Sequence, residues 1–508
     1  MKSGGRPQRT PARGVRRVLA LLAVLLSSLC LATPPTDPDL GWHLLGGAWI
    51  VAHRAVPASD FINSFNPSWH DYHWLGQLGL FGLFSLGGYR LLSVALALLM
   101  CALLLILSAI VASNRLAARH GSVAALFLLF SAALLLQIAQ IRPQMVALAG
   151  VAYALWLMLH PPWKWELLVL APLTVLLANI HVYWVFVPFL WFAYRCVPRL
   201  FRRRSLSPGL AWGGLALLSA AAFVSPYGLF VERGALPGVL MNYALVYEYL
   251  SIPSILRSTV GEFRSPFAMP GPGFYLLLLS IVLFLRNVHL RRLLARPGSA
   301  VGGAVAFALA ASGAKYVGVF AILGLPLLLD TQAAVVRDTL ARIDTLAGGR
   351  RVSLLVVAAA FAAMLLAWWP PVAPSEEALR ARYPLGACEA IPSLGLARRG
   401  ERDHLRILTH FDYGGWCRWF IFEKDPSADI RVTTDNRTQG VPPEFYADSM
   451  DLFFVRHAWA RTLGRWAPDA IVIRKDYPLA QVLALAHDQW AMRYEDDDWA
   501  VFVPSASS

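Results

Sequence analysis

Two aspartates, Asp37 and Asp39, flank a proline near the N-terminal end of the chain. Pro38 restricts the residue before it to an extended conformation, and Asp39 precedes a helical pattern that it can cap. His43 is spaced to share a face of that helix with Asp39. A partly buried carboxylate can act as a general base on a hydroxyl, or hold a divalent cation such as Mg²⁺ or Mn²⁺ on a phosphate. The spacing alone leaves open a simpler interpretation, a helix cap with a solvated turn.

Four more polar side chains stand in or beside apolar stretches: Arg142, His181, Glu262 and Lys315. A charge in an apolar stretch is costly unless it is paired or used, which makes Arg142 a candidate site residue. Structural roles stay open for three of them: snorkelling of Arg142 to the interface, a helix-end hydrogen bond for His181 and a surface salt bridge for Glu262. The middles of the apolar stretches carry almost no ionisable residues, which favours chemistry at one membrane surface over ion-coupled transport.

The composition of the chain is that of a membrane protein. Of its 508 residues, 57% are hydrophobic and 15% are charged, and apolar runs long enough to cross a bilayer recur up to residue 369. The net charge of +14 is concentrated between these runs, as the positive-inside rule expects. The expected partner of the basic residues is therefore the lipid bilayer, and no nucleic acid is needed to explain them.

The basic segments also predict the topology. They mark a cytoplasmic side at the N-terminus and at residues 114–120, 160–166, 199–204, 286–296 and 330–351. The apolar runs between them make about eleven transmembrane helices, with the N-terminus cytoplasmic and the C-terminus outside, in what we take to be a bacterial inner membrane. The first outer loop, residues 33–88, contains two helical patterns, 40–53 and 72–86, that are too short to cross and are expected to lie along the membrane surface.

The chain beyond residue 369 has the composition of a soluble protein. We therefore divide the sequence into a transmembrane domain, 1–369, and a small extracytoplasmic α/β domain, 370–508. Strands are predicted at 407–409, 430–433 and 470–473, a helix at 479–489, and a terminal hairpin from 490–495 and 499–503. Cys388 and Cys417 are the two cysteines of this domain. They can form a disulfide in an oxidising compartment, and two unpaired core residues are the alternative.

A series of different short motifs, shared with a known group of proteins, is spread in order along nearly the whole chain. They are Asp37-Pro38-Asp39 with Trp42-His43 and Gly46, Pro57 with Asp60-Phe61, His73-Trp74-Leu75, Arg142-Pro143-Gln144, Asn179-Ile180-His181, Ser225-Pro226-Tyr227-Gly228, Glu262-Phe263 with Ser265-Pro266, Phe320-Ala321-Ile322, Tyr413-Gly414-Gly415 and Asp435-Asn436-Arg437. In these motifs the chain resembles a group of bacterial membrane proteins related to the GT-C-type glycosyltransferases. The first outer loop, with its acidic motif and interfacial helices, is similar to that of the superfamily.

The resemblance implies an inverting transferase that moves a sugar from a polyprenyl-phosphate donor to an extracytoplasmic acceptor. It implies that Asp39 or Asp37 deprotonates the acceptor hydroxyl, and that these two would hold a divalent cation if one takes part. The candidate donor or phosphate-binding residues are Arg142, Lys315, His43 and His181. The candidate acceptor-binding or supporting residues are Asp60, His73 and Glu262.

Two positions depart from the pattern of that superfamily. His73 stands where an acidic residue is expected, unless Asp71 substitutes for it, and Lys315 stands where arginine is expected. A lysine still offers a cation to a lipid phosphate, but as a point charge rather than a planar fork. These departures favour the runner-up hypothesis, a non-catalytic cell-envelope assembly or scaffold protein on the same frame. A lipid or polysaccharide transporter is the third hypothesis, and the scarcity of midplane charge argues against it.

Overall fold

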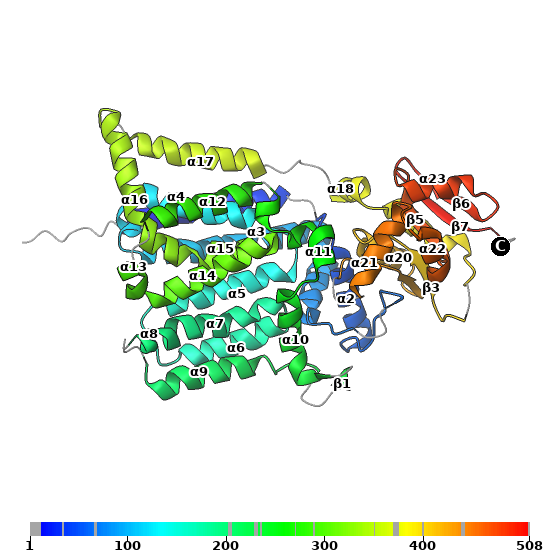
Figure 1. The fold of residues 1–508 in the computed structure, drawn as a ribbon, viewed down its shortest axis with the longest axis horizontal. Helices are drawn as coiled ribbons and strands as arrows, with labels where there is room; N and C mark the ends of the chain where they lie inside the picture. The colour runs from blue at the N-terminus through cyan, green and yellow to red at the C-terminus, as the bar shows by residue number, and fades with distance from the viewer. Residues whose placement is uncertain are drawn as a thin grey trace, which may run out of the picture.

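The fold is seen in a computed structural model that describes residues 12–32, 35–65, 69–201, 206–227, 232–233, 236–269, 271–287, 290–349, 351–368, 375–398, 401–437 and 442–505. Apolar helices make up one end of the molecule, and an α/β unit makes up the other (Figure 1). The helical body comprises α1 (Ala12–Ser27), α2 (Leu40–His53), α3 (Trp74–Ser113), α4 (Gly121–Leu136), α5 (Pro143–Met158), α6 (Glu166–Ala178), α7 (Phe186–Trp191), α8 (Val197–Leu200), α9 (Pro208–Ala221), α10 (Gly238–Leu250), α11 (Ser254–Thr259), α12 (Pro272–Asn287), α13 (Leu290–Ala295), α14 (Pro297–Ser312), α15 (Val317–Leu323), α16 (Leu325–Leu346) and α17 (Val352–Trp368). A two-stranded antiparallel ribbon of β1 (Glu232–Arg233) and β2 (Leu236–Pro237) precedes α10.

Several helices are suited to a membrane. By length and apolarity, two of the described helices can each cross a bilayer, Arg13–Ala32 and Trp74–Ser113. The pair Ala314–Leu323 and Leu325–Leu346, bent by 65°, makes a third if it is one span. A further seven apolar helices have only 10–17 residues. The protein is thus a membrane protein of mainly helical structure, and about eleven spans remains a prediction.

Both helical patterns that the sequence predicts within residues 33–88 are helices in the structure. Helix α2 has the predicted bounds, and the second pattern, residues 72–86, forms the first part of α3. The backbone of α3 breaks at Gly87 and Gly88, where Gly88 has a φ of 58° that favours glycine. This break separates the loop portion of α3 from the long apolar portion that follows it.

Residues predicted to share one side of the membrane do lie together. A cavity of about 640 Å³ at the end of the body that carries α8 and α13 is lined by Arg16, Asn114, His160, Arg296 and Asp330, all from segments predicted to be cytoplasmic. The segments predicted to be outside gather at the opposite end, next to the α/β unit (Figure 1).

The C-terminal unit, defined here as α18 to β7, is built on a five-stranded sheet. Its strands are β3 (Leu405–Leu408), β4 (Ile430–Val432), β5 (Ala470–Arg474), β6 (Trp490–Glu495) and β7 (Trp499–Pro504), in the order β4-β3-β5-β7-β6. Strand β3 runs parallel to β4 and β5, and β7 runs antiparallel to β5 and β6. The predicted strands and terminal hairpin are confirmed. The helices are α18 (Ser375–Arg382), α19 (Leu385–Ala390), α20 (Gly414–Lys424), α21 (Pro443–Phe453), α22 (Trp459–Trp466) and α23 (Pro478–Leu485).

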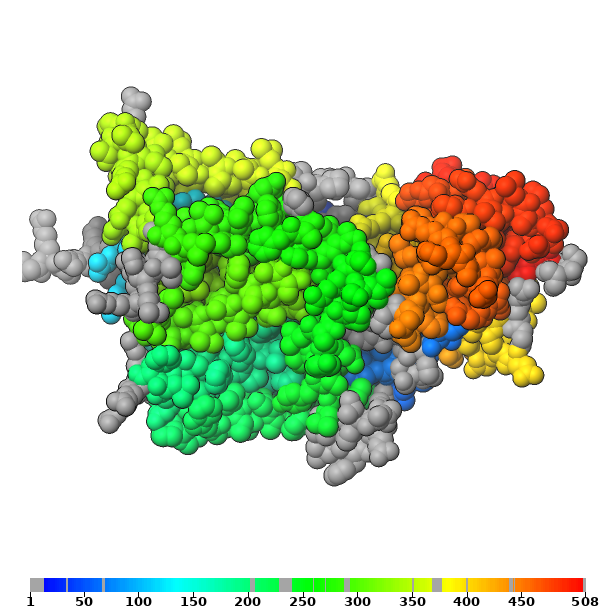
Figure 2. Space-filling model, viewed as in Figure 1, coloured from blue at the N-terminus to red at the C-terminus, as the bar shows by residue number. Residues whose placement is uncertain are grey.

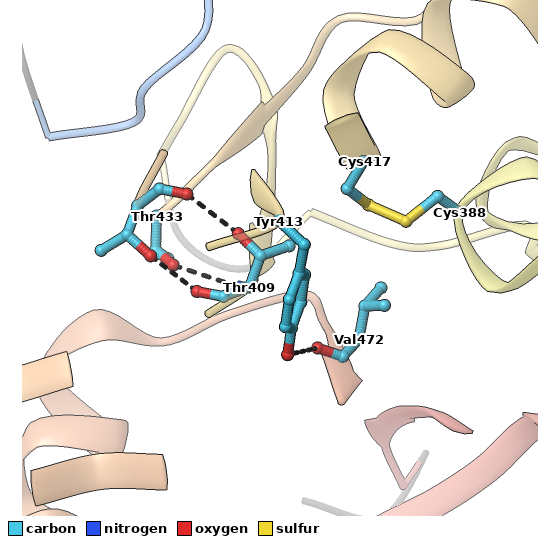
Figure 3. The surroundings of a disulfide bond; sticks show 7 residues. Cys388, Thr409, Tyr413, Cys417, Thr433 and Val472 are labelled. Carbon is cyan, nitrogen blue, oxygen red and sulfur yellow. Dashed lines mark hydrogen bonds between the residues drawn. A yellow bond between two sulfur atoms is a disulfide. The ribbon is translucent and has the colours of Figure 1, made fainter. Parts of the chain in front are cut away.

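A disulfide joins Cys388 and Cys417, so the bonded alternative is the one that the fold adopts (Figure 3). It ties α19 to α20. Beside it, Thr409 N donates a hydrogen bond to Thr433 Oγ1, and Thr409 exchanges two hydrogen bonds with Thr434. These bonds fasten the loop after β4 to the end of β3. The disulfide and these threonines therefore hold α20 and the loop after β4 in fixed positions within the unit.

The C-terminal unit is seated on the first outer loop (Figure 2). The edge strand β4 exchanges backbone hydrogen bonds with the loop: Val432 N donates to Ile62 O at 2.9 Å and Ser64 N donates to Val432 O at 2.8 Å. Trp416 Nε1 of α20 donates to the backbone oxygen of Asp37 at 2.7 Å. The loop thus extends the sheet at its edge and is buried between the two parts of the molecule.

Candidate active site

Arg142 organises a cluster of carboxylates at the end of the helical body that adjoins the C-terminal unit. It lies in extended conformation immediately before α5, whose first residue is Pro143, so its side chain is directed by the start of a helix. Its Nε lies 2.5 Å from Asp37 Oδ2, and its Nη1 lies 3.0 Å from Asp39 Oδ2 and 3.1 Å from Glu262 Oε2. Three acidic residues from distant parts of the sequence therefore share one guanidinium.

The two aspartates of the cluster differ in how they are held. Asp37 is 2% exposed, and its second oxygen, Oδ1, accepts a hydrogen bond from Asp39 N at 2.7 Å. Asp39 is 19% exposed and faces the cavity. Both oxygens of Asp37 are thus bonded within the protein, whereas Asp39 is the aspartate that a ligand can reach.

Burial governs the electrostatics of the cluster. It raises the pKa of Asp39 to about 7, against the opposing effect of Arg142 and with the repulsion of Asp37 and Glu262. It raises the pKa of Asp37 in the same way. Burial alone would lower the pKa of Arg142, but the three carboxylates hold it well above its ordinary value. Asp39 is therefore a carboxylate that can exchange a proton near neutral pH, beside a permanent cation.

Three histidines stand around the same cavity. The ring centroids of His43 and His73 are 5.1 Å apart, and those of His73 and His181 are 5.3 Å apart. His73 Nδ1 bonds to Ile180 O at 2.8 Å, and His181 Nδ1 accepts a hydrogen bond from Tyr183 N. Burial lowers the pKa of all three rings, to about 4 for His73. They are neutral at pH 7 and serve as hydrogen-bonding groups rather than as cations.

Lys315 is buried behind the aromatic wall of the cavity. Its Nζ lies 3.2 Å from the ring centroid of Tyr249 and 4.2 Å from that of Phe263. Among the described residues Nζ has no hydrogen-bond partner. The Lys315 side chain thus lies near the Arg142 cluster but forms no hydrogen bond to a carboxylate in the described part of the chain.

The cavity itself measures about 60 Å³. Most of the residues singled out from the sequence line it: Asp39, His43, His73, Arg142, His181 and Glu262. Asp37 lies behind Arg142, and Lys315 lies behind Tyr249 and Phe263, both of which line the cavity. Asp71, the substitute considered for an acidic residue at position 73, is not on the cavity wall. It accepts hydrogen bonds from His73 N and Gln77 Nε2 instead.

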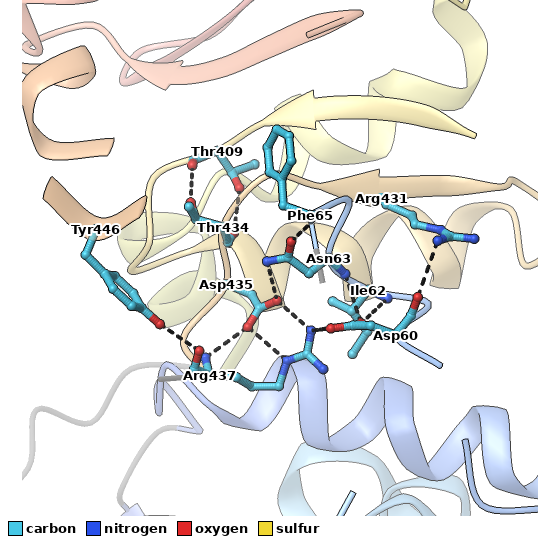
Figure 4. A network of polar contacts seen from close by, with 10 residues as sticks. All are labelled: Asp60, Ile62, Asn63, Phe65, Thr409, Arg431, Thr434, Asp435, Arg437 and Tyr446. Atoms are coloured by element: carbon cyan, nitrogen blue, oxygen red, sulfur yellow. Dashed lines mark hydrogen bonds and ion pairs between the residues drawn. The ribbon is translucent and has the colours of Figure 1, made fainter. Parts of the chain in front are cut away.

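Asp60 belongs to a second, buried ion cluster next to the cavity (Figure 4). Arg437 Nη2 lies 2.7 Å from Asp60 Oδ2 and 2.7 Å from Asp435 Oδ2, while its Nε donates to Asp435 Oδ1 at 2.9 Å. All three side chains are at most 2% exposed. Asp60 comes from the first outer loop and the other two from the C-terminal unit, so this triad joins the two parts of the molecule.

Two residues of the cavity wall, Asn436 and Arg437, were not among the predicted site residues. The available signal was their motif, which directly follows the predicted strand at 430–433. Ligands of open α/β sheets gather at the carboxyl ends of parallel strands, and β4 is such a strand. From this place after a strand the motif is predicted to be able to face a cleft beside the membrane domain, and the structure adds that Asn436 and Arg437 line the same cavity as Asp39.

A divalent cation held by Asp37 and Asp39 does not fit this arrangement. The guanidinium of Arg142 already occupies the space between the two aspartates and Glu262. Within the described part of the chain, no three His, Cys, Asp or Glu residues are grouped so that they could hold a metal ion. Arg142 thus supplies the positive charge that a cation would bring to the two aspartates.

Solved structures share this fold. The archaeal oligosaccharyltransferase AglB from Archaeoglobus fulgidus, in complex with an inhibitory peptide and a dolichol-phosphate, matches with a TM-score of 0.55 and 14% identity over 97% of this chain and 74% of that chain. The apo form of the Archaeoglobus fulgidus enzyme matches with a TM-score of 0.53 and 13% identity over 98% of this chain and 75% of that chain. ArnT from Cupriavidus metallidurans, bound to undecaprenyl phosphate, matches with a TM-score of 0.49 and 16% identity over 97% of this chain and 98% of that chain. Sequence comparison finds no matching family model and no matching curated protein.

The protein has a GT-C-type fold. The resemblance predicted from the sequence motifs is confirmed by the AglB structures, which match over nearly the whole of this chain. At 13–14% identity the likeness extends to the fold, and the substrates depend on the site.

Proposed function

We propose that this protein is a membrane glycosyltransferase that transfers a sugar from a polyprenyl-phosphate donor to an extracytoplasmic acceptor. The observation that carries the proposal is Asp39, a carboxylate whose pKa burial raises to about 7, in a cavity at the outer end of a GT-C-type fold. The positive-inside rule puts this end outside the cytoplasm, where lipid-linked sugars reach it from the outer leaflet.

The proposed reaction is a direct displacement with inversion. Asp39 takes the proton of an acceptor hydroxyl, and the resulting oxygen attacks the anomeric carbon of the sugar. The bond between that carbon and the lipid phosphate breaks, and its electrons leave with the phosphate. Arg142, 3.0 Å from Asp39, and Lys315, buried behind the neighbouring wall, are placed to stabilise the negative charge on the phosphate.

Asp37 has a different task in this proposal. Its two oxygens are taken up by Arg142 Nε and Asp39 N, so it positions both of these residues. His43, His73 and His181 are neutral and can donate or accept hydrogen bonds without competing with Arg142 for the phosphate. Glu262 is the third carboxylate at Arg142, and its negative charge helps to raise the pKa of Asp39.

Substitution of Asp39 tests the proposal. In membranes that contain the endogenous acceptor, undecaprenyl-phosphate hexoses are supplied and release of undecaprenyl phosphate is measured. We expect Asp39→Asn to reduce the release by at least about 100-fold, because a general base is lost. Thermal stability above pH 7 is expected to be retained, because burial disfavours the charge that the substitution removes.

The matched control is Asp338→Asn, which alters an exposed aspartate on α16 that is paired with Arg337. It is expected to release undecaprenyl phosphate at the wild-type rate. Full activity of Asp39→Asn would show that Asp39 is not the general base and would contradict the proposed mechanism. A scaffold protein would release no undecaprenyl phosphate in either form.

A further inference from the structure

The loop after β4 carries two residues of the C-terminal unit into the wall of the active-site cavity. Asn436 and Arg437 line it together with Asp39, Arg142 and Glu262, which belong to the helical body and its outer loops. The cavity is therefore complete only when the two parts of the molecule are docked. The side chains of this loop are in a position to touch whatever binds beside Asp39.

Arg437 retains a free donor although it is almost fully buried. Its Nε and Nη2 are held by Asp435 and Asp60, and its guanidinium stacks 4.2 Å from the ring centroid of Trp69. Nη1 is buried and has no hydrogen-bond partner among the described residues. A buried N–H group without a partner is unfavourable, so a ligand that accepts a hydrogen bond here gains affinity.

The positive charge of Arg437 is already neutralised by Asp60 and Asp435. Two buried carboxylates face a single guanidinium, which leaves no excess positive charge for an anion. Nη1 is thus a donor suited to a neutral oxygen. Lys315, which contacts aromatic rings, and Arg142, whose partner Asp39 loses its charge when it takes the acceptor proton, remain the candidates for a phosphate.

Asn436 contributes the complementary group. Its Oδ1 is buried and has no hydrogen-bond partner in the described part of the chain. Two adjacent residues of the cavity wall therefore carry one donor and one acceptor that are buried and have no partner among the described residues. A hydroxyl group can both donate and accept, so a pair of neighbouring hydroxyls satisfies both groups at once.

We infer that Asn436 and Arg437 bind neighbouring hydroxyl groups on the sugar of the lipid-linked donor, so that the C-terminal unit selects the sugar to be transferred. This inference rests on the proposed function. The sugar belongs to the donor because Lys315, a candidate for the lipid phosphate, lies directly behind the aromatic wall of this cavity. A volume of about 60 Å³ has room for about two water molecules, and hence for the hydroxyl edge of a sugar whose ring lies at the mouth.

The full-length protein in lipid nanodiscs provides the test. Binding of undecaprenyl phosphate is compared with binding of undecaprenyl phosphate linked to glucose, mannose or galactose, by native mass spectrometry. We expect the wild type to bind at least one hexose-bearing lipid about 10-fold more tightly than undecaprenyl phosphate itself. We expect Asn436→Ala to lose this preference and to keep its affinity for undecaprenyl phosphate within about 2-fold, because the phosphate is bound elsewhere.

Asn63→Ala is the matched control. Asn63 Nδ2 donates to Asp435 Oδ2 at 3.3 Å, so the variant weakens the same triad, but Asn63 does not line the cavity. It is expected to lower thermal stability and to keep the preference for the hexose. The comparison of the two variants separates the loss of sugar contacts from weaker docking of the C-terminal unit. Substitution of Arg437 would cause both effects at once, because Arg437 belongs to the triad and also lines the cavity.

Each outcome decides one of the two claims. A wild type that binds every hexose-bearing lipid no more tightly than undecaprenyl phosphate, or an Asn436→Ala variant that keeps the preference, overturns the inference and leaves the proposed function standing. A wild type that binds neither undecaprenyl phosphate nor its hexose derivatives contradicts the proposed function itself.

Discussion

At the scale of single residues, the site is defined by how one arginine is shared. A guanidinium that bonds to Asp37, Asp39 and Glu262 neutralises only part of their charge. Burial, together with the remaining negative charge, raises the pKa of Asp39. A carboxylate whose pKa is raised toward neutrality is a common feature of catalytic sites.

The raised pKa of Asp39 predicts the pH dependence of the reaction. Asp39 must be deprotonated to act as a base, so the rate should rise with pH through about 7 and then level off. The rise is measured as kcat/KM for release of undecaprenyl phosphate. A rate that stays constant as the pH passes through 7 would contradict the role of Asp39 as the base.

At the scale of elements, the site depends on how closely α2 approaches α20. Gly41 of α2 faces the backbone of Gly415 and Trp416, and a Cβ at position 41 would lie 2.7 Å from Trp416 Cα. Neither partner can move away easily, because both contacts are with backbone. Trp416 also donates to the backbone oxygen of Asp37, so the contact between the two helices sets the position of the acidic motif.

Gly41→Ala is therefore expected to force α2 and α20 apart. We predict a loss of roughly 1–3 kcal/mol in the free energy of unfolding and a lower rate of sugar transfer, measured by thermal denaturation and by release of undecaprenyl phosphate. Gly79→Ala is the matched control, because a Cβ at Gly79 of α3 meets nothing within 4 Å. Equal stability of the two variants would show that the contact of α2 with α20 is not tight in solution.

At the scale of the whole molecule, the C-terminal unit is a wall of the active site. It is joined to the first outer loop by backbone hydrogen bonds at β4 and by the Asp60–Arg437–Asp435 triad. Cutting a buried charge cluster leaves an uncompensated charge, so the triad opposes separation of the two parts. The disulfide beside it holds α20, which carries Trp416 against Asp37.

Loss of the disulfide should act on stability and activity together. The cysteines are 29 residues apart, and opening a loop of this length costs roughly 3–4 kcal/mol in the chain-entropy description. We expect the double variant Cys388→Ser/Cys417→Ser to unfold at a lower temperature and to transfer sugar more slowly. Cys101→Ser, which removes a free cysteine, is the control. Unchanged stability of the double variant would mean that packing alone holds α19 to α20.

The sequence by itself determined which parts are apolar, where α2 begins and ends, the strands of the C-terminal sheet and six of the residues that line the cavity, because each of these follows from local pattern or residue type. Only the tertiary structure decided that Arg142 is shared by three carboxylates, that Asp37 is enclosed while Asp39 is accessible, and that Asn436 and Arg437 complete the cavity. Asp60 and Arg437 are 377 positions apart. A contact at that separation depends on how the two folded parts dock. The burial that raises the pKa of Asp39 likewise depends on the docked arrangement.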